Sequence, residues 1–171
     1  KSSIMYNEAR QLLSDAKYDD AAVAFNALGD YKDAENMKKE AIFQKGCMLL
    51  NAQEFDEAIA IFGVLGNYGN SREKETEAYY QKAIFLKDNG DVEEAIKTFR
   101  NLSGYQDSDT QCVELQYDLA TDYLTNGQYN DAKTIFESIF AYKDSANLVK
   151  ECDYQKGCHY LENEQYLEAI E

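Results

Sequence analysis

The sequence contains no proline and no tryptophan, and it has one histidine among its 171 residues. Without proline, no helix interior is obliged to kink or to stop at a missing backbone donor. The four cysteines include no C-x-x-C pair, so the spacing of a zinc finger is missing and nothing requires an oxidising compartment. We therefore predict neither a metal site nor a cofactor. The cysteines are Cys47, Cys112, Cys152 and Cys158.

Basic residues are also few, 17 Lys and Arg against 32 Asp and Glu, which leaves a formal net charge of -15. Such a surface repels phosphate backbones and anionic lipid head groups, so nucleic acid and membrane surfaces are not expected partners. No run approaches the roughly 20 apolar residues of a membrane span, and the start has no signal-peptide pattern. The chain opens on Lys1 and stops at Glu171 inside a repeat, which predicts a piece of a longer protein. The compartment is only weakly indicated as cytoplasmic.

Self-similarity with a period of 37 residues is the strongest feature that the sequence does have. An aromatic or apolar residue is followed three places later by Ala in five successive copies, at Tyr18/Ala21, Phe55/Ala58, Val92/Ala95, Tyr129/Ala132 and Tyr166/Ala169. The same step links Phe25, Phe62, Phe99 and Phe136, and also Tyr31, Tyr68, Tyr105 and Tyr142. We predict a single repeat array over 1–171, with full repeats at 2–38, 39–75, 76–112 and 113–149 and a truncated fifth at 150–171.

Each repeat is predicted to contain two antiparallel helices. Apolar residues at i, i+3, i+4 and i+7 indicate a short helix, helix B, near 18–28, 55–65, 92–102 and 129–140. A longer helix A is expected near 34–51, 71–88, 108–125 and 145–162. Glycines in Asn89-Gly90 and Asn126-Gly127 indicate left-handed ends for two of the A helices. One hairpin cannot bury both of its faces, so stability must come from stacking. The predicted fold is all-α, an α-solenoid of helix-turn-helix repeats.

Small residues predict how the two helices of a repeat pack. A row of small side chains on helix A can face the Ala row of helix B, which lets the helices approach closely, and the Phe row then fills the gap between hairpins. The row on helix A consists of Ala9, Gly46, Ala83, Ala120 and Gly157. Cys152 stands where other repeats carry Ile or Ala or Leu, so we expect it to be a small buried apolar residue.

These residues resemble the tetratricopeptide repeat family. The second copy matches that pattern with Ile42, Lys45, Gly46 and Leu49 on helix A and Ala58, Phe62 and Leu65 on helix B. Two features depart from it: the period is 37 rather than 34, and the terminal proline is missing. In its place stands an element Tyr-x-Asp/Asn-Ser/Ala, here called the linker turn, at 31–34, 68–71, 105–108 and 142–145. This looks like a variant found in bacterial repeat proteins.

The acidic or amide residue of each linker turn is expected to cap the next helix A. These residues are Asp33, Asn70, Asp107 and Asp144. A catalytic reading of the Tyr-Asp pair is disfavoured because the pair recurs in each complete repeat. The single His159 matches Gln, Met, Phe and Asp in sister repeats, so we expect a surface residue. No nucleophile elbow, P-loop or H-E-x-x-H motif occurs, and we predict that the chain is not an enzyme.

Resemblance to the family implies that helix A lines a concave side on which peptides bind. Three rows then share that side: carboxylates at Glu40, Glu77, Glu114 and Glu151, aromatic rings at Phe43, Tyr80, Tyr117 and Tyr154, and amides at Gln44 and Gln81. The family's carboxylate clamp uses Lys, Arg and Asn, so it is not expected here. These rows favour a protein partner with a basic or neutral extended segment, bound through cation-π and apolar contacts.

Two alternatives remain beside this hypothesis. The rings can simply pack adjacent A helices together while the glutamates solubilise their rims. The array can also be a structural spacer or a self-association arm of a larger protein, which predicts concentration-dependent self-association and no saturable peptide ligand. A single deep pocket that breaks the repeat symmetry would instead indicate an enzyme.

Overall fold

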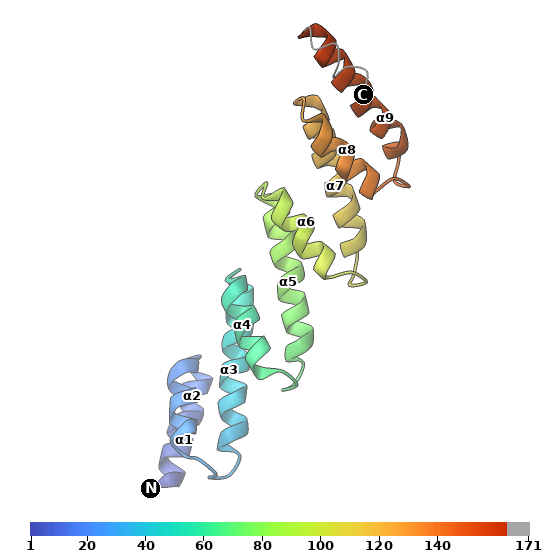
Figure 1. Ribbon diagram of the computed structural model, residues 1–171. Coiled ribbons are helices and arrows are strands. Elements are labelled where there is room, and N and C mark those ends of the chain that lie inside the picture. The colour runs from blue at the N-terminus through green and yellow to red at the C-terminus, as the bar shows by residue number, and fades with distance from the viewer. Residues whose placement is uncertain (164–171) are drawn as a thin grey trace. The chain divides into compact units, whose positions relative to one another are not determined.

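The computed structural model describes residues 1–163, and every regular element in that range is an α-helix. The predicted all-α class is confirmed, and consecutive helices pack against one another from α1 to α4 and from α6 to α9, as in a helical repeat protein (Figure 1). The helices are α1 (Ser2–Ser14), α2 (Tyr18–Asn26), α3 (Ala34–Asn51), α4 (Phe55–Leu65), α5 (Ser71–Asp88), α6 (Val92–Asn101), α7 (Ser108–Thr125), α8 (Tyr129–Ser138) and α9 (Ser145–Glu162).

The predicted bounds of the A helices agree with α3, α5, α7 and α9 at both ends. Three of the B helices, α2, α6 and α8, end one or two residues before their predicted limits. In α2 the reason is visible, because the Leu28 amide donates to the Phe25 carbonyl at 3.0 Å, a tighter i to i+3 bond. The predicted second helix of the fifth repeat, around Tyr166, lies outside the described residues.

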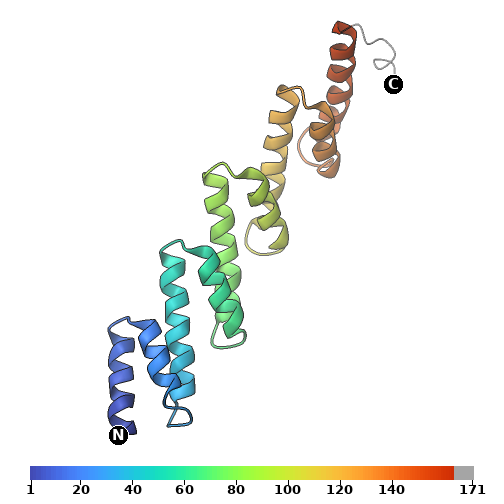
Figure 2. The same ribbon diagram turned by 60° about the vertical axis from the view of Figure 1, so that its left-hand side comes forward.

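The chain divides into two compact units, Lys1–Lys82 and Ala83 onward, with the division inside α5. In the first unit α2 packs on both α1 and α3, and α4 packs on α3. In the second unit α7 packs on α6 and α8, and α8 also packs on α9. Within the first unit the shorter α2 lies next to both α1 and α3, and Figure 2 shows it between them (Figures 1 and 2).

The core of each hairpin is built from the Ala and Phe rows of helix B. Ala21, Ala58, Ala95 and Ala132 are fully buried, and so are Phe25, Phe62, Phe99 and Phe136. Phe136 belongs to one apolar cluster with Ala120 of its own hairpin and Cys152 of the next. The prediction that the Phe row fills the space between hairpins is therefore confirmed at this position. Cys152 is 1% exposed, as expected for a small apolar residue.

Small residues of helix A lie against helix B at Ala9, Gly46 and Ala120. Ala9, Ala83 and Ala120 are fully buried, Gly46 is buried and Gly157 is half-buried. At Gly46 a Cβ would come within 2.8 Å of Cε1 of Phe62 and 2.9 Å of Cγ2 of Ile61. Glycine is thus required by close approach at this position, because a Cβ contact below about 3 Å would displace the ring beneath it.

Four A helices end in the same left-handed turn. The residue after the C-cap has a positive φ at Ala16, Gln53, Gly90 and Gly127. At Gln53 its amide donates to the Leu50 carbonyl at 3.1 Å, and the following Glu54 amide donates to Leu49 at 2.9 Å. This pair of bonds is the Schellman arrangement. The left-handed ends predicted at Asn89-Gly90 and Asn126-Gly127 are confirmed. Within residues 1–163 no helix is long and apolar enough to cross a membrane.

Candidate functional site

The three rows predicted on helix A lie on α3, α5, α7 and α9. Glu40, Phe43 and Gln44 are half-buried on α3, and Glu77, Tyr80 and Gln81 are half-buried on α5. On α7 Tyr117 is half-buried and Glu114 exposed, and on α9 Glu151 is half-buried while Tyr154 is 64% exposed. The first unit therefore holds the first six of these residues and the second unit holds the other four.

Glutamines hold three of the four carboxylates in place. Gln44 donates to Glu40 at 2.7 Å, and Gln81 donates to Glu77 at 3.1 Å. The same bond joins the next glutamine, Gln155, to Glu151 at 2.7 Å. A Glu and a Gln four residues apart face each other on one side of a helix, so the carboxylates and amides form an ordered polar strip on α3, α5 and α9. Glu114, which is followed four residues later by an aspartate, has no such bond.

Helix A rings also take part in packing. Phe43 contacts the buried Phe62 edge to face, with ring centroids 5.7 Å apart, and Tyr117 contacts Phe136 in the same way at 5.8 Å. Each ring meets the tyrosine of its linker turn as well, at 6.3 Å for Phe43 and Tyr68. These contacts agree with the alternative that the rings of helix A serve to pack helices together. Each of the two rings nevertheless keeps part of its surface exposed.

The linker-turn aspartates were predicted to cap helix A through their side chains, and this prediction is wrong. Asp33, Asp107 and Asp144 occupy the N-cap position, but none makes a side-chain cap bond. The physical reason is the backbone: Asp33 has φ -103° and ψ 25°, whereas capping requires an extended residue that turns its oxygen toward the helix. Two of these carboxylates instead accept bonds from helix A tyrosines, Asp33 from Tyr6 and Asp144 from Tyr117, the latter at 2.6 Å.

Each linker turn closes through a bond between its first and last residues. The Ala34 amide donates to the Tyr31 carbonyl at 3.1 Å, and the other three turns repeat this bond. The second residue has a positive φ in every copy, at Lys32, Gly69, Gln106 and Lys143. With a negative φ at the third residue, this is the pattern of a type II′ turn. The fourth residue is fully buried, which explains why it is always Ser or Ala.

The hydrogen bond between Tyr6 and Asp33 changes the acidity of both groups. The bond from Tyr6 holds the pKa of Asp33 below its usual range, and the same bond raises the pKa of Tyr6. In the second repeat burial, and then the bond to Glu40, raises the pKa of Tyr68 to about 12. The Asp33 carboxylate consequently stays charged around neutral pH, and the Tyr6 and Tyr68 phenols stay neutral.

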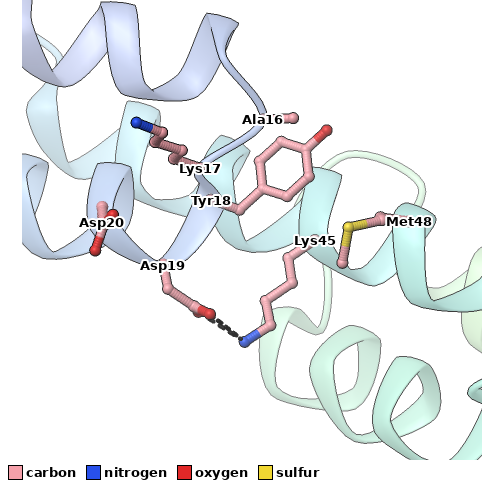
Figure 3. A pocket seen from close by; sticks show the side chains of 7 residues that line it. All are labelled: Ala16, Lys17, Tyr18, Asp19, Asp20, Lys45 and Met48. Atoms are coloured by element: carbon pink, nitrogen blue, oxygen red, sulfur yellow. Dashed lines mark hydrogen bonds and ion pairs between the residues drawn. The ribbon is translucent and has the colours of Figure 1, made fainter.

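An open pocket of about 300 Å³ lies where the first hairpin meets α3. Its lining includes Tyr18, Asp19 and Met48, and the Lys45 ammonium lies 2.6 Å from Asp19 (Figure 3). The fourth hairpin repeats this pocket at about 250 Å³, with Tyr129 and the exposed His159 among its lining residues. Because the pocket recurs at corresponding positions, it is a feature of the repeat rather than a unique catalytic cleft. The exposed Lys45–Asp19 ion pair contributes only about 0–1 kcal/mol to stability.

The Cys47 thiol lies beside the carboxylate rows. Burial raises its pKa, the Lys74 ammonium opposes this, and the Glu40 and Glu77 carboxylates add to the rise. Both carboxylates therefore raise the pKa of the same thiol. Such an anionic environment disfavours the reactive thiolate form of Cys47. In the described part of the chain, no group of three or more His, Cys, Asp or Glu side chains is arranged to hold a metal ion.

Sequence reasoning missed the lysines of the linker turns. Lys32 and Lys143 each place their ammonium over two tyrosine rings, between 4.5 and 5.4 Å from the centroids. The available signal was the basic second residue of the turn, together with the spacing of 27 residues between a helix A tyrosine and its aspartate.

Residues 76–106 match the family model described as Tetratricopeptide repeat. The matched segment runs from within α5 through α6 into the third linker turn. This match supports the resemblance to that family, whose repeats generally mediate protein–protein interaction and typically serve as non-catalytic scaffolds. No curated protein matches the chain.

Proposed function

We propose that the chain is a protein-binding scaffold whose helix A face takes a basic or neutral extended segment of a partner. The observation that carries this proposal is the repeated strip on α3, α5 and α9, in which a glutamine orients a half-exposed glutamate. Because the amides already order these carboxylates, less side-chain freedom is lost when a cationic or amide group binds them. The net charge of -15 favours the same class of partner.

The rings beside the strip supply apolar contact area. Tyr154 exposes 64% of its surface, and Phe43, Tyr80 and Tyr117 each expose part of a ring. Aromatic residues at the centre of an interface contribute more affinity than solvated charges at its rim. We therefore assign affinity mainly to the aromatic row, and association rate and selectivity to the glutamates.

The test begins with a pull-down by the full-length parent protein, followed by titration of the captured partner at two ionic strengths. Tyr154→Ala should weaken binding by more than about 1 kcal/mol, whereas a single Glu→Gln in the strip should cost about 0–1 kcal/mol. Replacing the strip glutamates together with Glu114 of the same row by Gln should slow association and flatten its salt dependence. The variants are Glu40→Gln, Glu77→Gln, Glu114→Gln and Glu151→Gln.

A matched control changes the net charge equally outside the strip, with four exposed glutamates replaced by Gln at Glu8, Glu57, Glu73 and Glu137. If the control slows association as much as the strip variant, general charge and not the helix A face attracts the partner. If Tyr154→Ala and the strip variant both bind unchanged, the proposed face is wrong. Concentration-dependent self-association without any captured partner would favour the spacer or self-association arm.

A further inference from the structure

Linker turns of the first and fourth repeats place an ammonium group against a pair of aromatic rings. The Lys32 ammonium lies 4.7 Å from the Tyr6 centroid and 5.4 Å from that of Tyr31. In the fourth repeat the Lys143 ammonium lies 4.5 Å and 5.0 Å from the corresponding rings. A carboxylate completes each group, because Asp33 and Asp144 accept the phenolic hydroxyls of the helix A tyrosines. Two repeats therefore hold a cation at equivalent positions.

The second repeat has the same ring pair with glycine in place of the lysine. Phe43 and Tyr68 meet at 6.3 Å and 63°, against 6.0 Å and 65° for the equivalent pair in the first repeat. Gly69 has φ +53°, the same value as Lys32. A Cβ on Gly69 would meet nothing within 4 Å. The rings are thus arranged as in the first repeat, and the first side-chain atom of a residue at position 69 would meet no neighbour.

A carboxylate is present in this repeat too, although it comes from helix A. Tyr68 donates to Oε2 of Glu40 at 3.0 Å, and Gln44 donates to Oε1 at 2.7 Å. Both bonds come from neutral donors, a phenol and an amide. The ammonium of Lys74, on the next helix, is 2.7 Å from Glu77. A carboxylate hydrogen-bonded to one ring of an aromatic pair offers an alkylammonium both a charged acceptor and aromatic surface.

We propose that Phe43, Tyr68 and Glu40 form a subsite for a lysine side chain of the bound partner. The partner's ammonium would occupy the place that Lys32 and Lys143 fill from within the chain in the sister repeats. This inference rests on the proposed function for the source of the lysine. It assigns the second repeat as the point of lysine selection on the helix A face, whereas the first and fourth repeats are closed to a second cation.

The subsite can be tested without a partner by titrating the chain with N-acetyl-lysine methylamide while following the ring resonances of Phe43 and Tyr68 by NMR. We expect a saturable shift of these resonances, and no such shift with the neutral N-acetyl-norleucine methylamide. Gly69→Lys supplies the internal ammonium and should abolish the shift. The first repeat carries lysine at the same φ, so this turn can accommodate the change. No lysine-specific shift in the parent, or an unchanged shift in Gly69→Lys, would overturn the proposal.

Two further variants keep the test decisive if Gly69→Lys folds poorly. Glu40→Gln leaves the rings in place and should weaken lysine binding several-fold, because the anionic partner is lost. Lys32→Gly should open the corresponding place in the first repeat and produce a new lysine-dependent shift at Tyr6 and Tyr31. Lysine binding that ignores both changes would contradict the assignment.

Failure of the subsite and failure of the proposed function give different results. A partner that depends on the glutamate strip but binds Gly69→Lys as well as it binds the parent would overturn the subsite alone. A lysine-specific shift in a chain that captures no protein would overturn the proposed function and support the subsite's chemistry.

Discussion

The fourth residue of the linker turn differs between repeats in its hydrogen bonding, and this difference should affect stability. The fourth residue of the turn is fully buried in every copy, as Ala34, Ser71, Ser108 and Ser145. The Ser71 hydroxyl donates to the Tyr68 carbonyl at 2.6 Å, whereas those of Ser108 and Ser145 have no hydrogen-bond partner. A buried hydroxyl without a partner costs free energy, and alanine of nearly the same shape removes that cost.

We expect Ser145→Ala to raise the free energy of unfolding by about 1 kcal/mol and Ser71→Ala to lower it by about 1 kcal/mol. The reason is that only Ser71 has a hydrogen bond to lose. Urea unfolding monitored by circular dichroism measures both. The first repeat carries Ala34 at this position, so the substitution is compatible with the turn. Equal losses in both variants would show that the Ser145 hydroxyl is satisfied in solution.

Tyr68 links stability to pH at the alkaline end. Its pKa in the folded chain is raised to about 12 from an ordinary value of 10.0, so folding favours the protonated phenol. The resulting stabilisation is complete below pH 10 and is lost as the pH rises through 12. We expect the stability difference between the parent and Tyr68→Phe to decline across this window. Urea midpoints at pH 9 and pH 11.5 measure it, and a difference that does not change with pH would contradict the raised pKa.

At the scale of the element, the left-handed ends of the A helices could be predicted only where a glycine indicated them. Gly90 and Gly127 marked left-handed ends, and the same turn occurs at Ala16 and Gln53, where nothing in the residue type indicates it. The helix bounds were nevertheless correct at α3, because a 37-residue period transfers the ends of one repeat to the next. The 37-residue period thus predicted the end of α3 although no residue type near Gln53 indicates a left-handed turn.

Gln53→Gly should raise the free energy of unfolding by about 1 kcal/mol, because an L-residue pays for the left-handed conformation that glycine adopts freely. The Gln53 side chain is exposed and its φ is +62°, so little is lost with the side chain. Gly90→Ala is the matched reverse change and should lower stability by a similar amount. Thermal and urea unfolding of both variants give the comparison. A loss of stability in Gln53→Gly would mean that backbone entropy outweighs the relieved strain.

For the whole molecule, stability comes from apolar clusters that each span neighbouring hairpins. The first unit contains one cluster around Phe25 and another around Phe62, and the second unit contains a cluster around Phe136. Each cluster draws on helices that adjoin in sequence, so the contacts are local. In repeat proteins of this kind, stability is approximately a sum of terms for each repeat and for each nearest-neighbour interface.

Phe136→Ala should therefore lower the stability of the hairpins around it by about 3–5 kcal/mol, because the fully buried ring leaves a cavity that packed helices do not close. Hydrogen exchange followed by mass spectrometry should show faster exchange in α7, α8 and α9 and little change in α1 and α2. Phe62→Ala is the counterpart and should affect α3 and α4. Uniform acceleration over the chain in both variants would show a single cooperative unit in place of local interfaces.

The amino-acid sequence by itself determined the helical class, the bounds of the long helices and the burial of the Ala and Phe rows. Each of these follows from spacing along one chain, and four copies of the spacing reinforce one another. Only the tertiary structure decided how side chains 27 or 28 residues apart meet. In the structure Asp33, which was expected to cap a helix, accepts a hydrogen bond from Tyr6, and Glu40 accepts one from Tyr68. Such contacts depend on backbone angles in the linker turn and on the packing of successive helices, which no residue pattern specifies.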